Sequence, residues 1–298
     1  MTAPTTGRWR PRLEPQVLTP DALRRIRLDL HPRLSTSEAL AILESRPHTS
    51  FWLPDSEEFI LVDAWRRRTE MSSIHTFGAF ANEDLLMSAV MAAAREAGQA
   101  AMVVVDINEI RKPEFFARHG FGIVEEIVTY AHPDLRSAVE AMPPPRLTFQ
   151  RLKDTDQDLL VRVIEVDHAA FPWFWWNSPA EFAEYLDYPG VEVWGGSLDG
   201  TVLGYAGMTR YHGWAHLDRI ATRPSVQGQG YGREMLHHMM REAARHGARS
   251  LALSTQLNNR QSRHLYERSG FEATPRDDYA IHIASFDDAR VLDGILPR

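Results

Sequence analysis

The sequence contains no cysteine among its 298 residues, which excludes disulfide bonds, thiolate nucleophiles and cysteine-ligated zinc. It also lacks any apolar run of about 18 residues, so no segment is expected to cross a membrane. Residues 1–16 have no apolar stretch of the kind found in secretory signal peptides, and they are predicted to form a disordered tail. Together these absences favour a cytoplasmic location.

Positive charge is also scarce in this chain. Lys and Arg total 33 against 40 Asp and Glu, which gives a formal net charge of −7. Domains that bind nucleic acid usually carry a basic excess, so nucleic acid is not expected as a partner, and neither is a membrane. The apolar content of 44% and the charged content of 24% are typical of a globular protein, and the length allows two domains.

Three consecutive prolines at residues 143–145 lie near the midpoint of the chain. They cannot continue a helix or join a central strand, so residues 141–146 are predicted to be a linker. In each half, a long helix ends at a glycine (Gly98, Gly247), and an apolar strand, a short helix ending in Gly-Phe (Gly120, Gly270) and another strand follow. This repeat predicts related domains at residues 17–140 and 147–298; two unrelated βαβ segments that look alike by chance are the alternative.

The second half has the clearer pattern of elements. Strands are expected at residues 147–152, 191–197, 202–209, 215–222, 251–255 and 279–284, and helices at 158–171, 179–186, 228–246 and 259–268. Asp199-Gly200 is a strong hairpin signal between two of these strands. The predicted fold class is α/β, with a mixed, mostly antiparallel twisted sheet flanked by helices in each of two tandem domains.

Residues 226–232 read VQGQGYG and lie directly before a predicted helix. Glycine is costly to order, so three of them in alternation indicate that something approaches the backbone closely. The N-terminus of a helix binds anions, because its first N–H groups lack partners. No lysine follows, which excludes a P-loop, and Arg233 stands where a dinucleotide-binding loop has its third glycine. A sharp strand-to-helix connection without a ligand is the alternative.

The region around this glycine loop is basic, although the whole chain is acidic. Residues 219–268 contain nine arginines and three glutamates. Arg223 and Arg233 flank the loop, whereas Arg241, Arg245 and Arg249 are expected on a solvated helix face. A local basic excess favours a polyphosphate ligand.

The glycine loop and a second motif about 27 residues later resemble the GCN5-related N-acetyltransferases. The matching positions are Gln227, Gly228, Gly230 and Gly232, then Asn259, Ser262, Leu265, Tyr266, Gly270 and Phe271. The resemblance covers residues 147–284 well and the first half in outline, as in tandem acetyltransferases. It implies an enzyme that uses acetyl-CoA as its acyl donor, needs no metal, and acetylates an amine by direct attack in a ternary complex. A non-enzymatic acyl-CoA sensor or scaffold is the alternative.

The resemblance also implies where acetyl-CoA lies. The pantetheine arm would pair with the strand end at Ile220, Ala221 and Thr222, and the Ile220 N–H would face the thioester oxygen. Asn259 and Ser262 would contact the same arm. The pyrophosphate would be held by Gln227, Gly228, Gln229, Gly230, Tyr231, Gly232 and Arg233.

Three residues are candidates for the chemistry. Tyr266 offers a phenol that can protonate the leaving thiolate, and a core tyrosine is its alternative. Alternation along the preceding strand places His216, Asp218 and Ile220 on one face, so that His216 is the candidate base and Asp218 orients it or binds a cationic acceptor. Alternatively, His216 simply fills the surface of the sheet.

An aromatic run, Trp173, Phe174, Trp175 and Trp176, is the candidate wall of the acceptor site, for an apolar or cationic acceptor. Packing between the two halves is the alternative. A small-molecule amine is the expected acceptor, and a protein N-terminus is possible. The repeat aligns residues 227–232 with 78–83, of which only Gly78 is a glycine, and Tyr266 with Phe116, so the first half is predicted to be catalytically silent.

Overall fold

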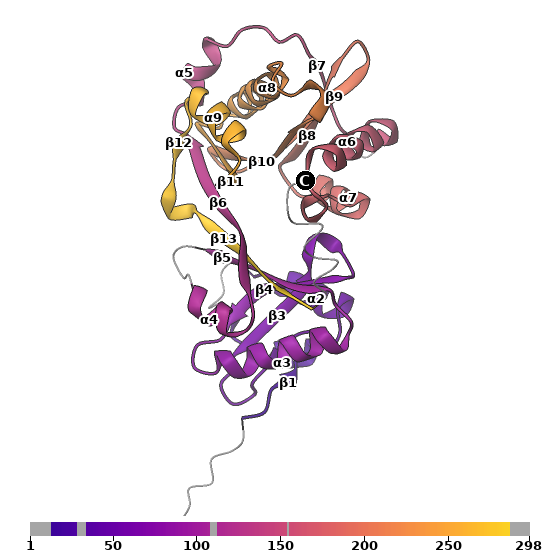
Figure 1. Ribbon diagram of the computed structural model, residues 1–298, viewed down its shortest axis with the longest axis vertical. Coiled ribbons are helices and arrows are strands. Elements are labelled where there is room, and N and C mark those ends of the chain that lie inside the picture. The colour runs from indigo at the N-terminus through magenta and orange to yellow at the C-terminus, as the bar shows by residue number, and fades with distance from the viewer. Residues whose placement is uncertain (1–12, 29–33, 108–111, 154, 287–298) are drawn as a thin grey trace, which may run out of the picture. The chain divides into compact units, whose positions relative to one another are not determined.

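The computed structural model describes residues 13–28, 34–107, 112–153 and 155–286 (Figure 1). The chain divides into two compact units: Met1–Trp65 with Thr69–Val104, and Arg66–Arg68 with Val105–Arg298. Most of the predicted disordered tail, residues 1–12, lies outside the described part of the chain. The compact units divide between Val104 and Val105 and are defined by contacts, not by sequence similarity. The repeat predicted from the sequence, with its linker at residues 141–146, therefore stays a prediction.

The first unit is a small sheet with helices packed on it. Its strands follow the order β1-β2-β3-β4-β5, antiparallel except for the parallel pair β4 and β5. Helices α1 and α2 share a buried cluster with Trp52, Phe59 and Leu61. The elements are β1 Gln16–Val17, α1 Pro20–Leu23, α2 Thr36–Ser45, β2 Phe51–Trp52, β3 Phe59–Ala64, β4 Met71–Gly78, α3 Glu83–Glu96 and β5 Ala101–Ile107, whose last residues belong to the second unit.

The second unit contains the remaining elements. Its helices are α4 Pro113–Arg118, α5 Leu135–Glu140, α6 Gln157–Ala170, α7 Pro179–Asp187, α8 Tyr231–Arg245 and α9 Arg260–Arg268. Short 3-10 turns are η2 Trp65–Arg67, whose first residue belongs to the first unit, η4 Trp173–Trp175, η5 Pro224–Val226 and η6 Pro275–Asp277. Its strands are β6 Gly122–His132, β7 Thr148–Arg151, β8 Val191–Leu198, β9 Thr201–Arg210, β10 Trp214–Thr222, β11 Ser250–Gln256, β12 Glu272–Ala273 and β13 Tyr279–Ser285.

The sheet of the second unit opens at its centre. Its strands follow the order β13-β6-β11-β10-β9-β8-β7, and every neighbouring pair is antiparallel except β10 with β11. That parallel pairing runs only from Trp214 to Leu217 on β10 and from Ser250 to Leu253 on β11. Beyond it, β10 stays with β9 and β11 stays with β6, so the two strands part. Along the parts of β10 and β11 that diverge, the backbone groups on the inner edge of each strand are not paired with the other strand.

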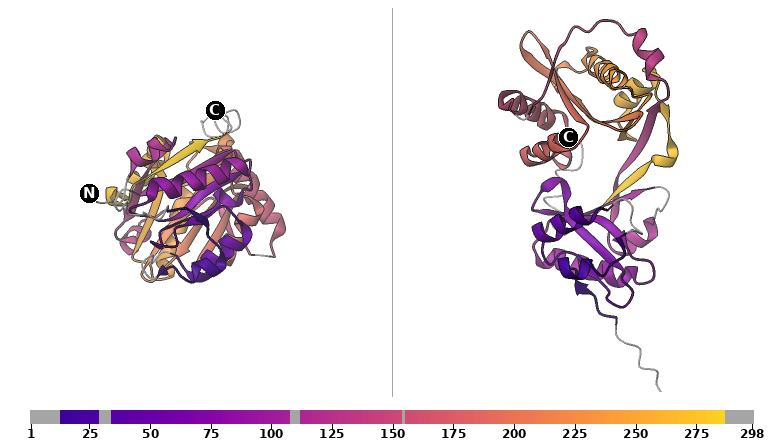
Figure 2. Two further views of the ribbon diagram at one scale, coloured as in Figure 1. Left: turned by 90° about the horizontal axis from the view of Figure 1, so that it is seen from below. Right: turned by 180° about the vertical axis from the view of Figure 1, so that it is seen from behind.

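Helices cover both faces of this sheet (Figures 1 and 2). Helices α6 and α7 pack with Val202 and Tyr205 of β9 in one buried cluster. Helix α8 packs with Ala206 and Met208 of the same strand, on the other face, in a second cluster that includes Tyr266 of α9. The glycine loop joins strand β10 of this sheet to helix α8.

Local sequence signals predicted this unit well. Every strand and helix expected between residues 147 and 284 is present, within three residues at each end. The largest difference is the start of the helix after the glycine loop, which begins at Tyr231 instead of Gly228. Gly228 and Gly230 adopt φ values of 78° and 91°, which a helix cannot continue through. The glycines that end the matched helices, Gly98, Gly120, Gly247 and Gly270, all have positive φ.

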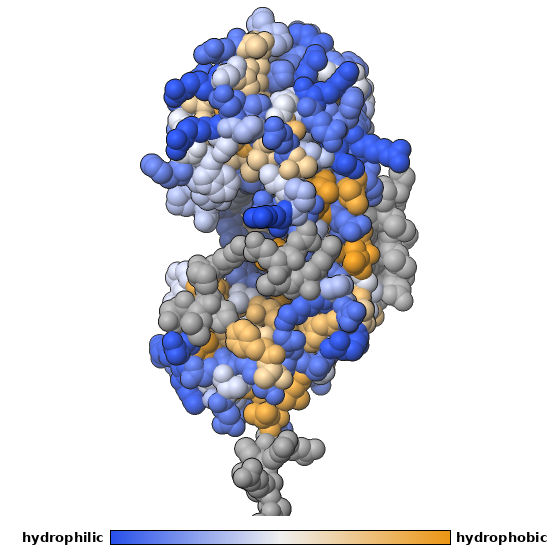
Figure 3. All heavy atoms as spheres, turned by 90° about the vertical axis from the view of Figure 1, so that its left-hand side faces the viewer, coloured by the Kyte–Doolittle hydropathy of each residue, from blue (hydrophilic) through white to orange (hydrophobic). Residues whose placement is uncertain are grey.

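Within the described residues, no helix is both long and apolar enough to cross a bilayer. On the face drawn in Figure 3, hydrophilic residues are widespread and hydrophobic ones gather in limited groups. Ile123 on β6 and Leu257 after β11 are among the exposed large hydrophobic side chains.

Candidate functional site

The glycine loop presents a row of unused backbone donors. Within the described part of the chain, no partner is found for the N–H groups of residues 228–232, which precede or begin α8. Gly230 is the N-cap of α8 and has no side chain to satisfy these groups. The positive end of the helix dipole points to the same place. The loop therefore has the donors that an anion such as a diphosphate requires.

Arginine side chains surround the loop. A Cβ built on Gly230 would lie 3.3 Å from Arg146 Nη2 and 4.0 Å from Arg233 Nη2. Arg146 is fixed there because its Nε donates to Glu234 (2.5 Å), its Nη2 donates to the Gln229 carbonyl (2.9 Å), and its guanidinium lies over the Tyr231 ring. Arg223, in contrast, pairs with Glu165. Arg146, which the sequence motif does not include, is thus the arginine held against the loop.

Two adjoining cavities lie where β10 and β11 part. One, of about 260 Å³, runs from the loop at Gln227 and Gly232 along Ile220–Thr222. The other, of about 150 Å³, continues past His216 and Asp218. They share the walls Phe171, Ile220, Asn259, Ser262 and Tyr266. A larger hollow of about 680 Å³ lies near Asp156 and Arg162, away from every predicted site residue.

A β-bulge on β10 changes which residues face which side. The pairing of β10 with β9 shifts register between Leu217 and Arg219. The predicted alternation is therefore wrong beyond the bulge: Ile220 packs against the cluster that contains Leu217, whereas Arg219 contacts Asp167 of α6. A bulge inserts one residue and reverses the side-chain parity that follows it.

His216 and Asp218 nevertheless lie side by side in the cavity wall. His216 Nδ1 is 2.8 Å from Asp218 Oδ1. The other carboxylate oxygen accepts hydrogen bonds from the hydroxyls of Tyr185 and Thr209, the latter at 2.7 Å. Gly207 makes room for Tyr185, because a Cβ there would lie 2.9 Å from its hydroxyl oxygen. Both oxygens of Asp218 are thus committed to holding His216 and the neighbouring hydroxyls.

Tyr266 is buried on α9 and lines both cavities. Burial raises the pKa of Tyr266 to about 12, although a hydrogen bond with Ser262 opposes the shift. The phenol is therefore neutral at physiological pH and able to donate a proton. Asn259 caps α9 by accepting from the Ser262 N–H (3.1 Å), and it also lines both cavities.

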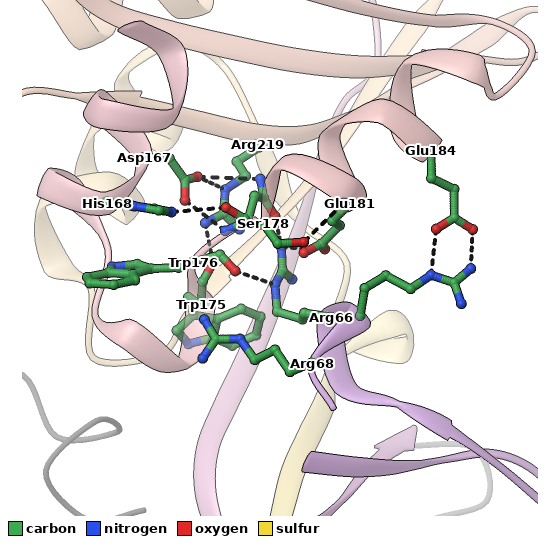
Figure 4. A network of polar contacts seen from close by, with 12 residues as sticks. Arg66, Arg68, Asp167, His168, Trp175, Trp176, Ser178, Glu181, Glu184 and Arg219 are labelled. Carbon is green, nitrogen blue, oxygen red and sulfur yellow. Dashed lines mark hydrogen bonds and ion pairs between the residues drawn. The ribbon is translucent and has the colours of Figure 1, made fainter. Parts of the chain in front are cut away.

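Side chains of the protein itself hold the aromatic run (Figure 4). The guanidinium of Arg68 lies over the Trp173 ring, that of Arg66 lies over Trp175, and Trp176 stacks on His168. Phe174 is fully buried. Of the four predicted acceptor residues, Trp175 borders the cavity of about 150 Å³.

A buried ionic network fixes this aromatic run to the sheet (Figure 4). Asp167 of α6 accepts from Arg219 Nε (2.7 Å), from the Asn177 N–H (2.9 Å) and from the Tyr205 hydroxyl. Arg219 also donates to the Trp175 carbonyl. Breaking such a buried pair costs about 3–5 kcal/mol, because one charge is left without its partner. The network therefore positions Trp175 firmly at the cavity.

The loop of the first unit that the repeat aligns with the glycine loop is filled by the chain's own carboxylate. Glu58 Oε2 accepts from the N–H groups of Phe80, Ala81 and Asn82 at 2.9, 3.0 and 2.9 Å. Oε1 accepts from the Asn82 side chain at 2.8 Å. Burial raises the pKa of Glu58, but these hydrogen bonds outweigh it and leave the pKa below its ordinary value. An anion thus already occupies the donors before α3.

We expect Glu58→Gln to destabilise this loop by about 2 kcal/mol at pH 7, since hydrogen bonds to a charged group are lost and an N–H₂ meets N–H donors. The pKa of Glu58 is lower in the folded protein than its unfolded value of about 4.3. The stabilisation is therefore fully present above about pH 4.3 and is lost as the pH falls through the folded pKa. Hydrogen exchange of residues 80–86 at pH 7 measures the effect. Glu57→Gln, at the exposed neighbour, is the control. Equal exchange in both variants would show that the carboxylate does not hold the loop.

A cluster of metal-ligand type is found elsewhere in the described residues. Ligand atoms of Glu192, Glu242 and His246 lie within 4.8 Å of one another. Arg210 and Arg151 lie 3.3 and 3.4 Å from Glu192 Oε1, so arginines already supply the positive charge that a cation would bring. These residues line neither cavity at the glycine loop.

Several residues of the site lie outside the sequence motifs. Tyr185 and Thr209 hold Asp218, Arg146 lies against the loop, and Glu125 of β6 accepts a hydrogen bond from Trp175 Nε1 (2.9 Å). Apart from Glu125, no local pattern marks them, because each reaches the site through pairing or packing with distant segments. A charged residue in the apolar strand that follows Gly-Phe is the one signal that could have drawn attention to Glu125.

The comparisons with known proteins agree with this geometry. Residues 160–271 match the model of the acetyltransferase (GNAT) family. A ribosomal protein bS18-alanine N-acetyltransferase of Escherichia coli K12 is 30% identical over 151 residues, which cover 49% of this chain and 95% of the relative. An uncharacterised N-acetyltransferase of Mycobacterium tuberculosis H37Rv is 29% identical over 96 residues, covering 32% of this chain and 62% of the relative. The protein is therefore an acyltransferase.

More particularly, the chain belongs to the GNAT family of acetyltransferases. A tandem GNAT protein from the clavulanic acid biosynthesis pathway shares its fold with a TM-score of 0.60 at 13% identity, over 91% of this chain and 98% of that one. A GCN5-related N-acetyltransferase from Sphaerobacter thermophilus has a TM-score of 0.57 at 17% identity, over 91% and 95%. These structures confirm the predicted fold class.

Proposed function

We propose that this protein transfers the acetyl group of acetyl-CoA to an amine, by direct attack in a ternary complex. The observation that carries the proposal is the row of unused N–H donors at residues 228–232, which opens onto the cavity between the parting strands. Arg146 and Arg233 supply positive charge beside it. An acyl-CoA fits this arrangement, because its pyrophosphate is an anion for the loop and its narrow pantetheine arm suits the cavity.

The cavity walls supply the groups that the chemistry requires. His216, held by Asp218, takes a proton from the acceptor ammonium through a water molecule. The neutral amine forms a C–N bond to the thioester carbon, and the Ile220 N–H stabilises the developing oxyanion. When the C–S bond breaks, the sulfur receives a proton from Tyr266, whose neutral phenol lines the same cavity.

We also propose that the chain uses one coenzyme molecule. In the first unit, the amides before α3 already bind Glu58, and Phe116 stands at the position that the repeat aligns with Tyr266. The loop lacks an open donor row and the aligned position lacks an acid. This supports the prediction that the first half is catalytically silent.

The acceptor is proposed to be a small amine or, as a second candidate, a protein N-terminus. The cavity of about 150 Å³ beyond Tyr266 has room for a small molecule. The second candidate rests on the Escherichia coli relative, whose name specifies an alanine of a ribosomal protein. Alanine has no side-chain amine, so its α-amino group is the one acetylated in that case.

Release of CoA thiol tests the proposal. The full chain is incubated with acetyl-CoA and, separately, with n-butylamine, 1,4-diaminobutane, amino acid amides and a peptide that begins with alanine. We expect amine-dependent thiol release with a coenzyme stoichiometry of about one by calorimetry. Binding of acetyl-CoA without release on any amine would contradict the transferase proposal, and a stoichiometry of two would contradict the silent first unit.

A further inference from the structure

Asp218 is the residue that the β-bulge inserts into β10. The pairing with β9 passes directly from Leu217 to Arg219 while β9 advances by one residue, so Asp218 has no residue of its own opposite it. Bulges re-aim side chains and are frequent beside active sites. Here the bulge places Asp218 Oδ1 2.8 Å from Nδ1 of His216, which comes two residues earlier on the same strand.

This contact determines which nitrogen of His216 carries a proton. An ionised carboxylate can only accept hydrogen bonds, so Nδ1 is the donor to Asp218. A neutral imidazole has one N–H, so its Nε2 then has a free lone pair. Among the described residues, no hydrogen bond reaches Nε2, and the His216 side chain is 33% exposed in the wall of the cavity of about 150 Å³. Nε2 is therefore the atom that can accept a proton from a ligand.

Two hydroxyl groups hold the Asp218 carboxylate in this orientation. Its Oδ2 accepts from Thr209 Oγ1 at 2.7 Å and from the Tyr185 hydroxyl. Thr209 lies opposite His216 in the pairing of β9 with β10, whereas Tyr185 reaches from α7 to the space beside Gly207. Burial and the charge of Asp218 raise the pKa of Tyr185, so its phenol stays protonated and remains a donor. The carboxylate is thus fixed by groups from two different elements.

We propose that Tyr185 and Thr209 are positioning residues for the acetyl transfer: their hydroxyls hold Asp218 so that His216 stays in its Nδ1–H tautomer. The inference rests on the proposed function, in which His216 removes a proton from the acceptor ammonium. Nε2 receives that proton through the water molecule while Nδ1 keeps its own, and the imidazolium so formed faces the Asp218 carboxylate. The aspartate of a serine protease triad orients its histidine in the same way. A carboxylate that turns away leaves the imidazole free to adopt the Nε2–H form, which has no lone pair for the proton.

Tyr185→Phe tests the role of the phenol in steady-state kinetics. The acceptor is whichever of n-butylamine, 1,4-diaminobutane, the amino acid amides or the alanine peptide releases thiol fastest. We expect kcat to fall by about 10- to 100-fold, as fits one lost hydrogen bond to a charged group, with the KM of the amine and the acetyl-CoA affinity within about threefold. Tyr188→Phe is the control, because this tyrosine follows the same helix and its side chain is exposed. A wild-type kcat in Tyr185→Phe would overturn the inference.

Thr209→Val and Thr209→Ser separate hydrogen bonding from packing. Valine keeps the branched shape of threonine without its hydroxyl, whereas serine keeps the hydroxyl and loses the methyl group. Thr209 is buried, so a role in packing alone predicts that Thr209→Ser is the more damaging change. We expect the opposite order, with kcat lowered by about 10-fold in Thr209→Val and by less than about threefold in Thr209→Ser. The packing order would contradict the proposed role of the hydroxyl.

NMR of the nitrogen-15-labelled full chain shows the tautomer directly. Two-bond proton–nitrogen correlations at about pH 9, where an ordinary histidine is neutral, distinguish Nδ1–H from Nε2–H, and the signals missing in His216→Gln identify the residue. We expect Nδ1–H in the wild-type protein. We expect Nε2–H in Asp218→Asn, because Tyr185 and Thr209 still donate to the side-chain oxygen and so turn the new N–H₂ toward Nδ1. Nε2–H in the wild-type protein would overturn the inference.

The proposed function can fail separately, if the wild-type protein releases thiol with none of the amines. The spectra then decide on the arrangement alone. Nδ1–H in the wild-type protein that changes to Nε2–H in Asp218→Asn supports it, and the same tautomer in both proteins overturns it.

Discussion

Replacing Tyr266 by Phe is expected to lower kcat by about 100-fold or more while the dissociation constant of acetyl-CoA changes by less than about threefold. The substitution removes one oxygen from a buried side chain and leaves its ring in place. The departing thiolate then has no acid beside it, whereas the loop and strand contacts that bind the coenzyme remain. Thiol release at saturating amine gives kcat, and calorimetry gives the dissociation constant.

Tyr130→Phe is the control for this variant. Tyr130 is also buried, its ring centroid lies 6.2 Å from that of Tyr266, and it does not line either cavity at the loop. It too loses one hydroxyl, together with its hydrogen bonds to Glu267 and Arg263 of α9, so its kcat reports the effect of disturbing this region without removing the proposed acid. If Tyr266→Phe turns over at the wild-type rate, Tyr266 is not the acid and only packs the core.

The pH profile gives a second readout of Tyr266. Its pKa of about 12 lies above that of an ordinary tyrosine, near 10, because of burial. A group that acts as an acid works below its pKa, so deprotonation of this phenol lowers kcat only when pH approaches 12. We expect no alkaline decline of kcat from Tyr266 between pH 8 and about 10. A decline centred near pH 10 that is absent in Tyr266→Phe would contradict the buried setting of the acid.

The sequence predicted those parts of the site whose causes are local. Gly228 and Gly230 mark the turn before α8 because few other residues adopt their positive φ. Asn259 caps α9, as its place before a helix suggests. Hydrophobic periodicity then located the elements to within three residues, since burial on one face imposes that period.

The remaining parts depend on long-range pairing that no local pattern encodes. The bulge between Leu217 and Arg219 arises in the pairing of β10 with β9, and it turned Ile220 to the face opposite the predicted one. Glu125 contacts Trp175, 50 residues later in the sequence, because β6 inserts between β11 and β13. Glu58 likewise accepts from the N–H groups of Phe80 and Ala81, which come 22 and 23 positions later in the sequence.

Gly230→Glu is expected to weaken acetyl-CoA binding by at least about 100-fold. The new carboxylate begins at the N-cap of α8, where the N–H groups of residues 228–232 and the side chain of Arg146 converge. It would occupy those donors itself, much as Glu58 does in the first unit, and it would repel phosphate. Losing two or more charge-assisted hydrogen bonds accounts for about 3 kcal/mol, which is a factor of more than 100 in affinity.

Backbone strain has to be separated from this charge effect. Gly230 has a φ of 91°, a conformation that costs a non-glycine residue about 1–2 kcal/mol. Gly247 follows the other end of the same helix with a φ of 84° and open space around its Cβ position, so Gly247→Glu carries the same strain and charge away from the loop. We expect both variants to lose thermal stability, Gly247→Glu by more because its carboxylate lies at the negative end of the helix dipole, and only Gly230→Glu to lose acetyl-CoA binding in calorimetry. Unchanged affinity in a folded Gly230→Glu protein would mean that the coenzyme phosphates bind elsewhere, because no diphosphate can share those amides with a fixed carboxylate.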